Sequence, residues 1–229
     1  MSDRNPAPAT AAGLAEPDLV AAMRNLPGCR EYLDLPVEDA VLHRVLDSAR
    51  FAPSGGNRQG WRVAVVRDAN TKRALRDLYL APWLRYVNEH YGTDETMSED
   101  RKRRVADATR MAESMDEVPV HLVVWLDMSV VAVTDSAAGR PSVVAGGSVF
   151  PFIQNVQLAA RAEGLGTRIT TLLSEEEAAV RALVRAPDGW ALAALVLVGW
   201  PVRLPKKLSR EPVETFTWLE HFGGATFTV

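Results

Sequence analysis

Hydrophobic residues recur along this chain in two different patterns. Spacings of three and four residues, which are typical of amphipathic helices, run through 37–49, 98–115 and 144–163. Runs rich in β-branched and other apolar residues favour strands. These runs cover 61–67, 118–126, 167–173 and 190–200. The chain is therefore expected to contain both helices and strands.

The run Val118–Leu126 is the most apolar of the predicted strands. Its nearly continuous hydrophobicity predicts a central strand that is buried on both faces. Pro119 must then lie at the start of the strand, because proline cannot donate to a sheet. His121 has no second His or Cys nearby at metal-ligand spacing, so a core histidine with a satisfied nitrogen is favoured over a ligand or a base.

Several helix boundaries follow from individual residues. Asp68 can cap a helix that runs through Leu78, and Pro82 is expected to break or kink this helix. Ser174 and Glu177 have the spacing of a capping box at the start of another helix. Residues 144–163 are small and apolar almost all round the predicted helix, which suits a buried, central position that can also contact a symmetry mate.

Composition narrows the class of protein. The 229 residues, 47% of them hydrophobic, suit one large or two small domains. The net charge of -3 and the absence of a long basic run argue against a nucleic-acid partner. No apolar run is as long as a membrane span. No Ser-His-Asp or zinc constellation is visible in the sequence, so no metal site is predicted.

The cellular compartment is predicted from the cysteine content and the N-terminus. The single cysteine, Cys29, excludes an intrachain disulfide framework and fits a reducing compartment. Residues 1–16 are rich in alanine and proline but lack a hydrophobic signal region, which predicts a disordered tail. A soluble cytoplasmic protein is therefore expected.

The segment Ala52–Arg62 has a composition that an ordinary linker does not need. Pro53 fixes φ, whereas Gly55 and Gly56 permit positive φ and let another body approach the backbone. Side chains that both donate and accept hydrogen bonds belong to Ser54, Asn57 and Gln59. Such a loop can hold a flat heterocycle with alternating donors and acceptors. The alternative is a plain loop and turn before a strand.

This segment, Ala-Pro-Ser-Gly-Gly-Asn-x-Gln-x-Trp-Arg, resembles the signature of the nitroreductase superfamily of FMN-dependent oxidoreductases. A second motif, Ile-Gln-Asn-x-x-Leu-Ala-Ala-x-Ala-x-Gly-Leu-Gly, ends at Gly166 and leads into a short strand. A third, Pro205–Val213, resembles a C-terminal basic segment of that family. The three motifs have the expected order and spacing, and the resemblance covers Arg24 to Val213.

The resemblance implies an α+β fold, with a nitroreductase-like mixed β-sheet flanked by helices. It implies that 17–229 forms a single FMN-dependent domain after the disordered tail at 1–16. The expected assembly is an intertwined homodimer with two FMN sites at its interface. The aromatic C-terminal tail, 213–229, is then expected to cross to the partner subunit.

The resemblance also indicates which residues hold the phosphate. The family carries an Arg-Ser-x-Arg-x-Phe pattern, in which Arg30 matches the second Arg and Tyr32 the Phe. Pro27 and Gly28 replace the first Arg and the Ser, so the phosphate needs a further partner. The C-terminal segment offers Arg210, with Lys206 and Lys207 nearby, for charge-assisted hydrogen bonds.

The ring of FMN is expected to contact two segments. The loop contributes Pro53, Ser54, Gly55, Asn57 and Gln59. The backbone after strand 167–173 faces the reactive edge of the flavin in the family, and by position this backbone belongs to Thr170, Thr171 and Leu172. A threonine hydroxyl or an amide can then donate to N5 or O4. The alternative is that the two threonines simply belong to a half-buried strand.

The implied activity is a ping-pong transfer of hydride from NADH or NADPH, through FMN, to a nitroaromatic, a quinone or a similar small acceptor. The flavin supplies the chemistry, so no indispensable catalytic carboxylate or histidine is expected. Other branches of the superfamily remain alternatives: a flavin-cleaving enzyme of cobalamin-ligand synthesis, a dehalogenase and an azoline-type dehydrogenase. A flavin-sequestering protein without turnover is a further one.

Two segments have undecided roles in this scheme. The aromatic residues around Trp83 belong either to the core or to a substrate pocket. The strongly charged helix 98–115 is either a plain surface helix or a lid over a cavity.

Overall fold

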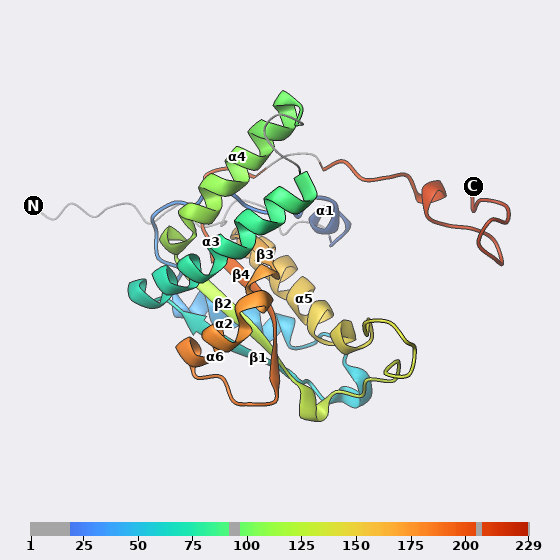
Figure 1. Ribbon diagram of the computed structural model, residues 1–229, viewed down its shortest axis with the longest axis horizontal. Helices are drawn as coiled ribbons and strands as arrows, with labels where there is room; N and C mark the ends of the chain where they lie inside the picture. The colour runs from blue at the N-terminus through green and yellow to red at the C-terminus, as the bar shows by residue number, and fades with distance from the viewer. Residues whose placement is uncertain (1–18, 92–96, 205–207, 229) are drawn as a thin grey trace, which may run out of the picture.

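The computed structural model describes residues 19–91, 97–204 and 208–228, and its centre is a four-stranded sheet (Figure 1). The strand order is β1-β2-β4-β3, so β2 and β4 are central and β1 and β3 are edges. Every pairing between these strands is antiparallel. The strands are β1 (Trp61–Val66), β2 (Val120–Asp127), β3 (Gly166–Thr170) and β4 (Trp190–Gly199).

Helices cover both faces of the sheet, which confirms the α+β class. They are α1 (Leu19–Arg24), α2 (Asp39–Ala49), α3 (Ala69–Tyr91), α4 (Glu99–Glu113), α5 (Val149–Ala162) and α6 (Glu177–Val184). The predicted sheet was mixed, which requires at least one parallel pair of strands. All strand pairs among the described residues are antiparallel. The predicted tail at 1–16 lies outside the described residues. None of the described helices is long and apolar enough to cross a bilayer.

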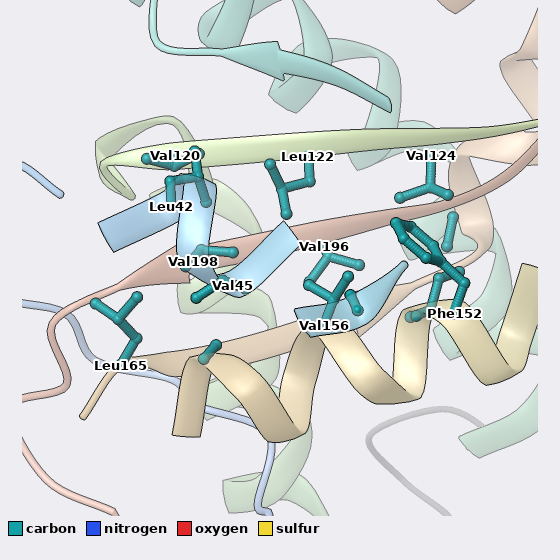
Figure 2. Close-up of a cluster of buried hydrophobic side chains, with 14 of the residues drawn as sticks. Leu42, Val45, Val120, Leu122, Val124, Phe152, Val156, Leu165, Val196 and Val198 are labelled. Atoms are coloured by element: carbon teal, nitrogen blue, oxygen red, sulfur yellow. The ribbon is translucent and has the colours of Figure 1, made fainter. Parts of the chain in front are cut away.

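The two hydrophobic cores lie on opposite faces of the sheet because side chains alternate along each strand. On one face, α2 and α5 pack against Val120, Leu122 and Val124 of β2 and against the matching residues of β4, as Figure 2 shows. On the other face, α3, α4 and α6 pack against Val123 and Trp125. Burial of both faces confirms that Val118–Leu126 supplies the central strand.

The helix boundaries agree only partly with the predictions. The Asp68 carboxylate accepts a hydrogen bond of 2.8 Å from the Thr71 amide, as a cap should. Pro82 lies inside α3 without breaking it, and the buried residues Tyr79, Trp83 and Val87 hold the helix to the core on both sides. The prediction of a capping box at Ser174 is wrong. The Ser174 hydroxyl donates to the Thr171 carbonyl inside a 3₁₀ turn, and α6 begins only at Glu177.

His121 is a core residue, as its position predicted. Its ring is fully buried, and Nε2 donates to the Met115 carbonyl at 2.7 Å. The pKa of His121 is lowered from 6.5 to about 4, mainly by burial and in smaller part by the nearby ammonium group of Lys72. The hydrogen bond to Met115 and the carboxylate of Asp116 oppose this shift but do not cancel it. The ring is therefore neutral in the folded protein near neutral pH.

This burial predicts an acid-dependent loss of stability. The pKa of His121 is depressed on folding, so the unfolded chain binds a proton below pH 6.5 that the folded chain does not bind until about pH 4. As the pH falls from 6.5 to about 4, we expect His121 to lower the free energy of unfolding by about 3 kcal/mol. Urea unfolding of the wild type and of His121→Gln across this range measures it. Equal pH slopes for the two proteins would contradict the prediction.

Candidate functional site

A cavity of about 500 Å³ opens between the edge strand β3 and helices α3 and α4. Aromatic side chains of α3 form one wall: Tyr79, Trp83, Tyr86 and Tyr91. The opposite side is lined by the end of β3, from Arg168 to Thr170, and by the two residues that follow. Three arginines also line the cavity: Arg30 before α2, Arg104 of α4 and Arg168 of β3. The cavity therefore combines flat apolar surfaces with positive charge.

Arg30 reaches this cavity because the segment 29–33 lies along the ends of β3 and β4. The Cys29 amide donates to the Thr167 carbonyl and the Leu33 amide to the Trp200 carbonyl, both at 2.8 Å. Close approach requires glycine in β3: a Cβ on Gly166 would lie 2.7 Å from the Cys29 sulfur. Tyr32 packs against the same region, and its hydroxyl donates to the Cys29 carbonyl at 3.4 Å.

Arg168 is a site residue that the sequence reasoning missed. It pairs with Leu197 in the register of β3 and β4, so its side chain lies on the face covered by α3 and α4. It is half-buried, and burial lowers the pKa of Arg168, with a further contribution from the charge of Arg30. Among the described residues it has neither an acidic partner nor a hydrogen bond. The sequence could have indicated Arg168, because it lies two residues before Thr170 and both side chains therefore lie on one face of the strand.

The three residues predicted to face the flavin edge line the cavity together. The Thr170 hydroxyl donates weakly to the Tyr79 hydroxyl, and the Leu172 amide donates weakly to the Thr170 hydroxyl, both at 3.4 Å. Thr171 is exposed where the chain turns from β3 into a 3₁₀ turn, Leu172–Glu176. The region thus offers a hydroxyl and a backbone amide that are only weakly engaged.

Both undecided segments contribute to the cavity. Trp83 is 6% exposed, and its indole nitrogen donates to the Thr109 hydroxyl of α4 at 2.9 Å. It therefore belongs to the core and to the cavity wall at once. Helix α4 adds Val105 and Ala108 to the lining, so it covers the cavity as well as carrying a charged outer face.

The loop predicted to hold a heterocycle lies in a different place. Gly55–Asn57 forms a 3₁₀ turn, and Ser54, Gly55 and Gln59 line a separate hollow of about 230 Å³. Its other side is lined by residues 130–132, Val144, Gly147 and Ser148. Pro53 precedes it and is exposed. Asn57 and Gln59 have positive φ values of 53° and 49°, which non-glycine residues rarely adopt. Such strain often marks functional loops.

Hydrogen bonds within the loop hold this conformation. The Gln59 amide donates to the Ser54 hydroxyl at 3.1 Å, and the Gln59 side chain donates to the Asn57 side chain at the same distance. These bonds fix the direction of the polar groups before any ligand arrives. The loop is therefore preorganised.

Within a single chain, the loop and the cavity lie at opposite edges of the sheet. The loop joins the β1 edge, where the Asp127 amide bonds to the Gly60 carbonyl, whereas Arg168 lies on the β3 edge level with His121 (Figure 1). The register implies a separation of about 20 Å along the strands and about 14 Å across them. The predicted site residues therefore form two groups in a single chain.

Of the predicted C-terminal phosphate ligands, Arg210 lines neither the cavity nor the hollow at the loop. Arg210 is exposed, and its guanidinium donates only to the neighbouring Ser209 carbonyl at 2.7 Å. Lys206 and Lys207 fall outside the described residues. The tail then leads away from the body (Figure 1), with Phe216 59% and Phe222 89% exposed. Within one chain, Arg210 does not join Arg30.

Comparison with known proteins shows the family to which this fold belongs. The Nitroreductase family model matches residues 28–200, and the chain belongs to this family. It is 28% identical over 176 residues to 5,6-dimethylbenzimidazole synthase of Rhodospirillum rubrum, which covers 75% of this chain and 76% of that protein. It is 26% identical over 221 residues to nitrobenzene nitroreductase of Ectopseudomonas oleovorans, with coverage of 84% and 92%.

Solved structures share the fold at lower identity. Iodotyrosine deiodinase bound to FMN and 3-iodo-L-tyrosine superposes with a TM-score of 0.68 at 22% identity, covering 90% of this chain and all of the other (100%). The FMN- and NADPH-dependent nitroreductase NfnB from a Sphigopyxis strain gives a TM-score of 0.66 at 19% identity, with coverage of 90% and 100%. These structures confirm the nitroreductase fold.

The contact between Gly166 and Cys29 predicts a sensitive position. Gly166→Ala should destabilise the protein by about 1–3 kcal/mol, because the new methyl group overlaps the Cys29 side chain and pushes the Arg30 segment away from β3. Gly28→Ala is the matched control, since nothing lies within 4 Å of its added Cβ. Chemical denaturation measures both variants, and a Gly166→Ala protein as stable as the control would refute the contact.

Proposed function

We propose that this chain is an FMN-dependent oxidoreductase that uses NADH or NADPH to reduce a nitroaromatic, a quinone or a similar small acceptor. The observation that carries the proposal is the cavity at β3, in which an aromatic wall faces the Thr170–Leu172 backbone and two neighbouring arginines. Family membership adds the expectation of FMN. A single buried cysteine and the absence of disulfides in the described residues fit a cytoplasmic enzyme.

The residues present fit a flavin nucleotide. A planar ring system suits the tyrosine and tryptophan faces of α3, and an anionic group suits the arginines. Arg168 in particular is a half-buried cation without an anionic partner among the described residues, as expected where a ligand supplies the negative charge. When bound, FMN supplies the hydride and electron transfer.

The chain's own residues then have separate tasks. Arg30 binds the anionic part of the nucleotide. The Thr170 hydroxyl and the Leu172 amide donate hydrogen bonds to the polar edge of the ring, which their weak present contacts leave them free to do. Tyr79 and Trp83 exclude water from the ring and position a flat acceptor. The described lining residues include no Asp, Glu or His, which supports chemistry without a protein acid or base.

We propose that the complete site is formed by two chains. The loop with Ser54, Asn57 and Gln59 is preorganised yet lies far from the cavity of its own chain. This separation supports a role for the loop at the cavity of a partner. The exposed aromatic tail, with Phe216 and Phe222, supports a homodimer because burial of such side chains on a partner is favourable. In that assembly we expect Arg210 to contact the partner's nucleotide.

A second candidate is flavin cleavage, which the similarity to 5,6-dimethylbenzimidazole synthase favours. The two functions differ in the fate of the flavin. Reduced FMN exposed to oxygen in the presence of the protein would be consumed and yield dimethylbenzimidazole in the second case. Recovery of intact FMN after many turnovers supports the reductase.

The proposed activity predicts a spectroscopic change. Purified protein supplied with FMN should show a flavin spectrum that NADH or NADPH bleaches under anaerobic conditions, and a nitroaromatic or a quinone should restore it. Alternating additions of donor and acceptor measure this. A bound flavin that neither nucleotide reduces would contradict the proposal and favour sequestration.

The two-chain site predicts complementation between variants. Arg30→Ala and Asn57→Ala should each reduce flavin retention by about tenfold or more, because each removes one part of both sites. A heterodimer of the two variants would contain one site with both residues and one with neither. Co-expression with two affinity tags and flavin quantification should therefore show about half of the wild-type occupancy. A heterodimer as empty as either homodimer would place both residues in one chain's site.

A further inference from the structure

Three arginines, Arg30, Arg104 and Arg168, line the cavity, and its described lining contains no acidic residue. The charge of Arg30 contributes to lowering the pKa of Arg168. The nearest acid in sequence, Glu31, is engaged elsewhere: it accepts from Arg203 at 3.2 Å. Neither Arg30 nor Arg168 has an ion pair among the described residues, whereas arginines such as Arg44 and Arg85 have carboxylate partners.

Such an arrangement is unfavourable in the empty protein. Half-burial removes water from the Arg168 guanidinium, and a second guanidinium nearby adds repulsion. The surroundings compensate only with neutral groups, because Tyr32, Tyr79 and Cys29 are the other ionisable neighbours and their pKa values are raised by burial. An anionic ligand is the missing partner.

The strand determines which end of a flavin nucleotide meets this pair. Thr170 and Leu172 mark the reactive edge of the ring in the proposed function, on which this inference rests. Arg168 lies two residues back along β3, about 7 Å from Thr170 and toward the segment that carries Arg30. Arg168 therefore lies farther from the reactive edge of the ring than Thr170 does. The phosphate is the only formally charged group of oxidised FMN.

The same region lacks two expected phosphate ligands. Pro27 and Gly28 stand where the phosphate pattern has an arginine and a serine. The pairing of Cys29 with Thr167 holds β3 beside the N-terminal segment. The guanidinium of an arginine on β3 can therefore replace that of an arginine in the N-terminal segment. We infer that Arg168 is a phosphate-binding residue that replaces the missing arginine and, with Arg30, selects the phosphorylated flavin.

Affinities for two flavins test this inference. Arg168→Met should weaken FMN binding by at least about tenfold, because it removes charge-assisted hydrogen bonds, and should leave riboflavin binding unchanged. Arg168→Lys should recover part of the FMN affinity, since it keeps the charge without the fork of donors. Arg44→Met, a surface arginine on the other face of the sheet, is the control and should bind both flavins as the wild type does. Fluorescence titration measures all four proteins.

Stability of the flavin-free protein gives an independent measurement. Loss of an unpaired, half-buried charge should leave flavin-free Arg168→Met at least as stable as the flavin-free wild type, although FMN should raise its melting temperature less. A variant with unchanged FMN affinity, or with equal losses for FMN and riboflavin, would overturn the inference. A wild type that binds neither flavin would instead overturn the proposed function, so the two failures are distinguishable.

Discussion

The site depends on one backbone pairing, the hydrogen bond from the Cys29 amide to the Thr167 carbonyl at 2.8 Å. It joins the N-terminal segment to an edge strand, and Gly166 makes the close approach possible. Without it, Arg30 would belong to a surface segment near no other site residue. The pairing is stable because β3 is itself held by β4, a strand buried on both faces. The chemistry at the surface thus rests on a rigid interior.

Helix α3 shows how one element serves both stability and function. Its side chains on the sheet side, such as Leu75, are fully buried, whereas Tyr86 and Tyr91 extend the same aromatic row into the cavity. Tyr79 and Trp83 belong to both groups. Aromatic residues suit such a boundary, since they pack like core residues and still present a polar tip or a flat face to a ligand. A change at either position is therefore expected to affect packing and binding together.

The sequence allowed the class of fold, the central strand, the core histidine and the family to be predicted, because each depends on local pattern or on a contiguous motif. Arg168 was missed because its importance comes from burial and from Arg30, more than a hundred positions away in the chain. The capping box at Ser174 failed because a 3₁₀ turn after β3 displaced the start of α6. The separation of the loop from the cavity follows from strand order, which periodicity does not reveal.

The separation of the two groups of site residues has an energetic consequence. A lone chain carries an unpaired guanidinium at Arg168, positive φ at Asn57 and Gln59, and exposed aromatic side chains in its tail. Each feature is unfavourable by itself. In the proposed assembly, an anion would pair with Arg168 and a second chain would bury the aromatic side chains. Ligand binding and association would then stabilise one another, since both act on the same assembled site.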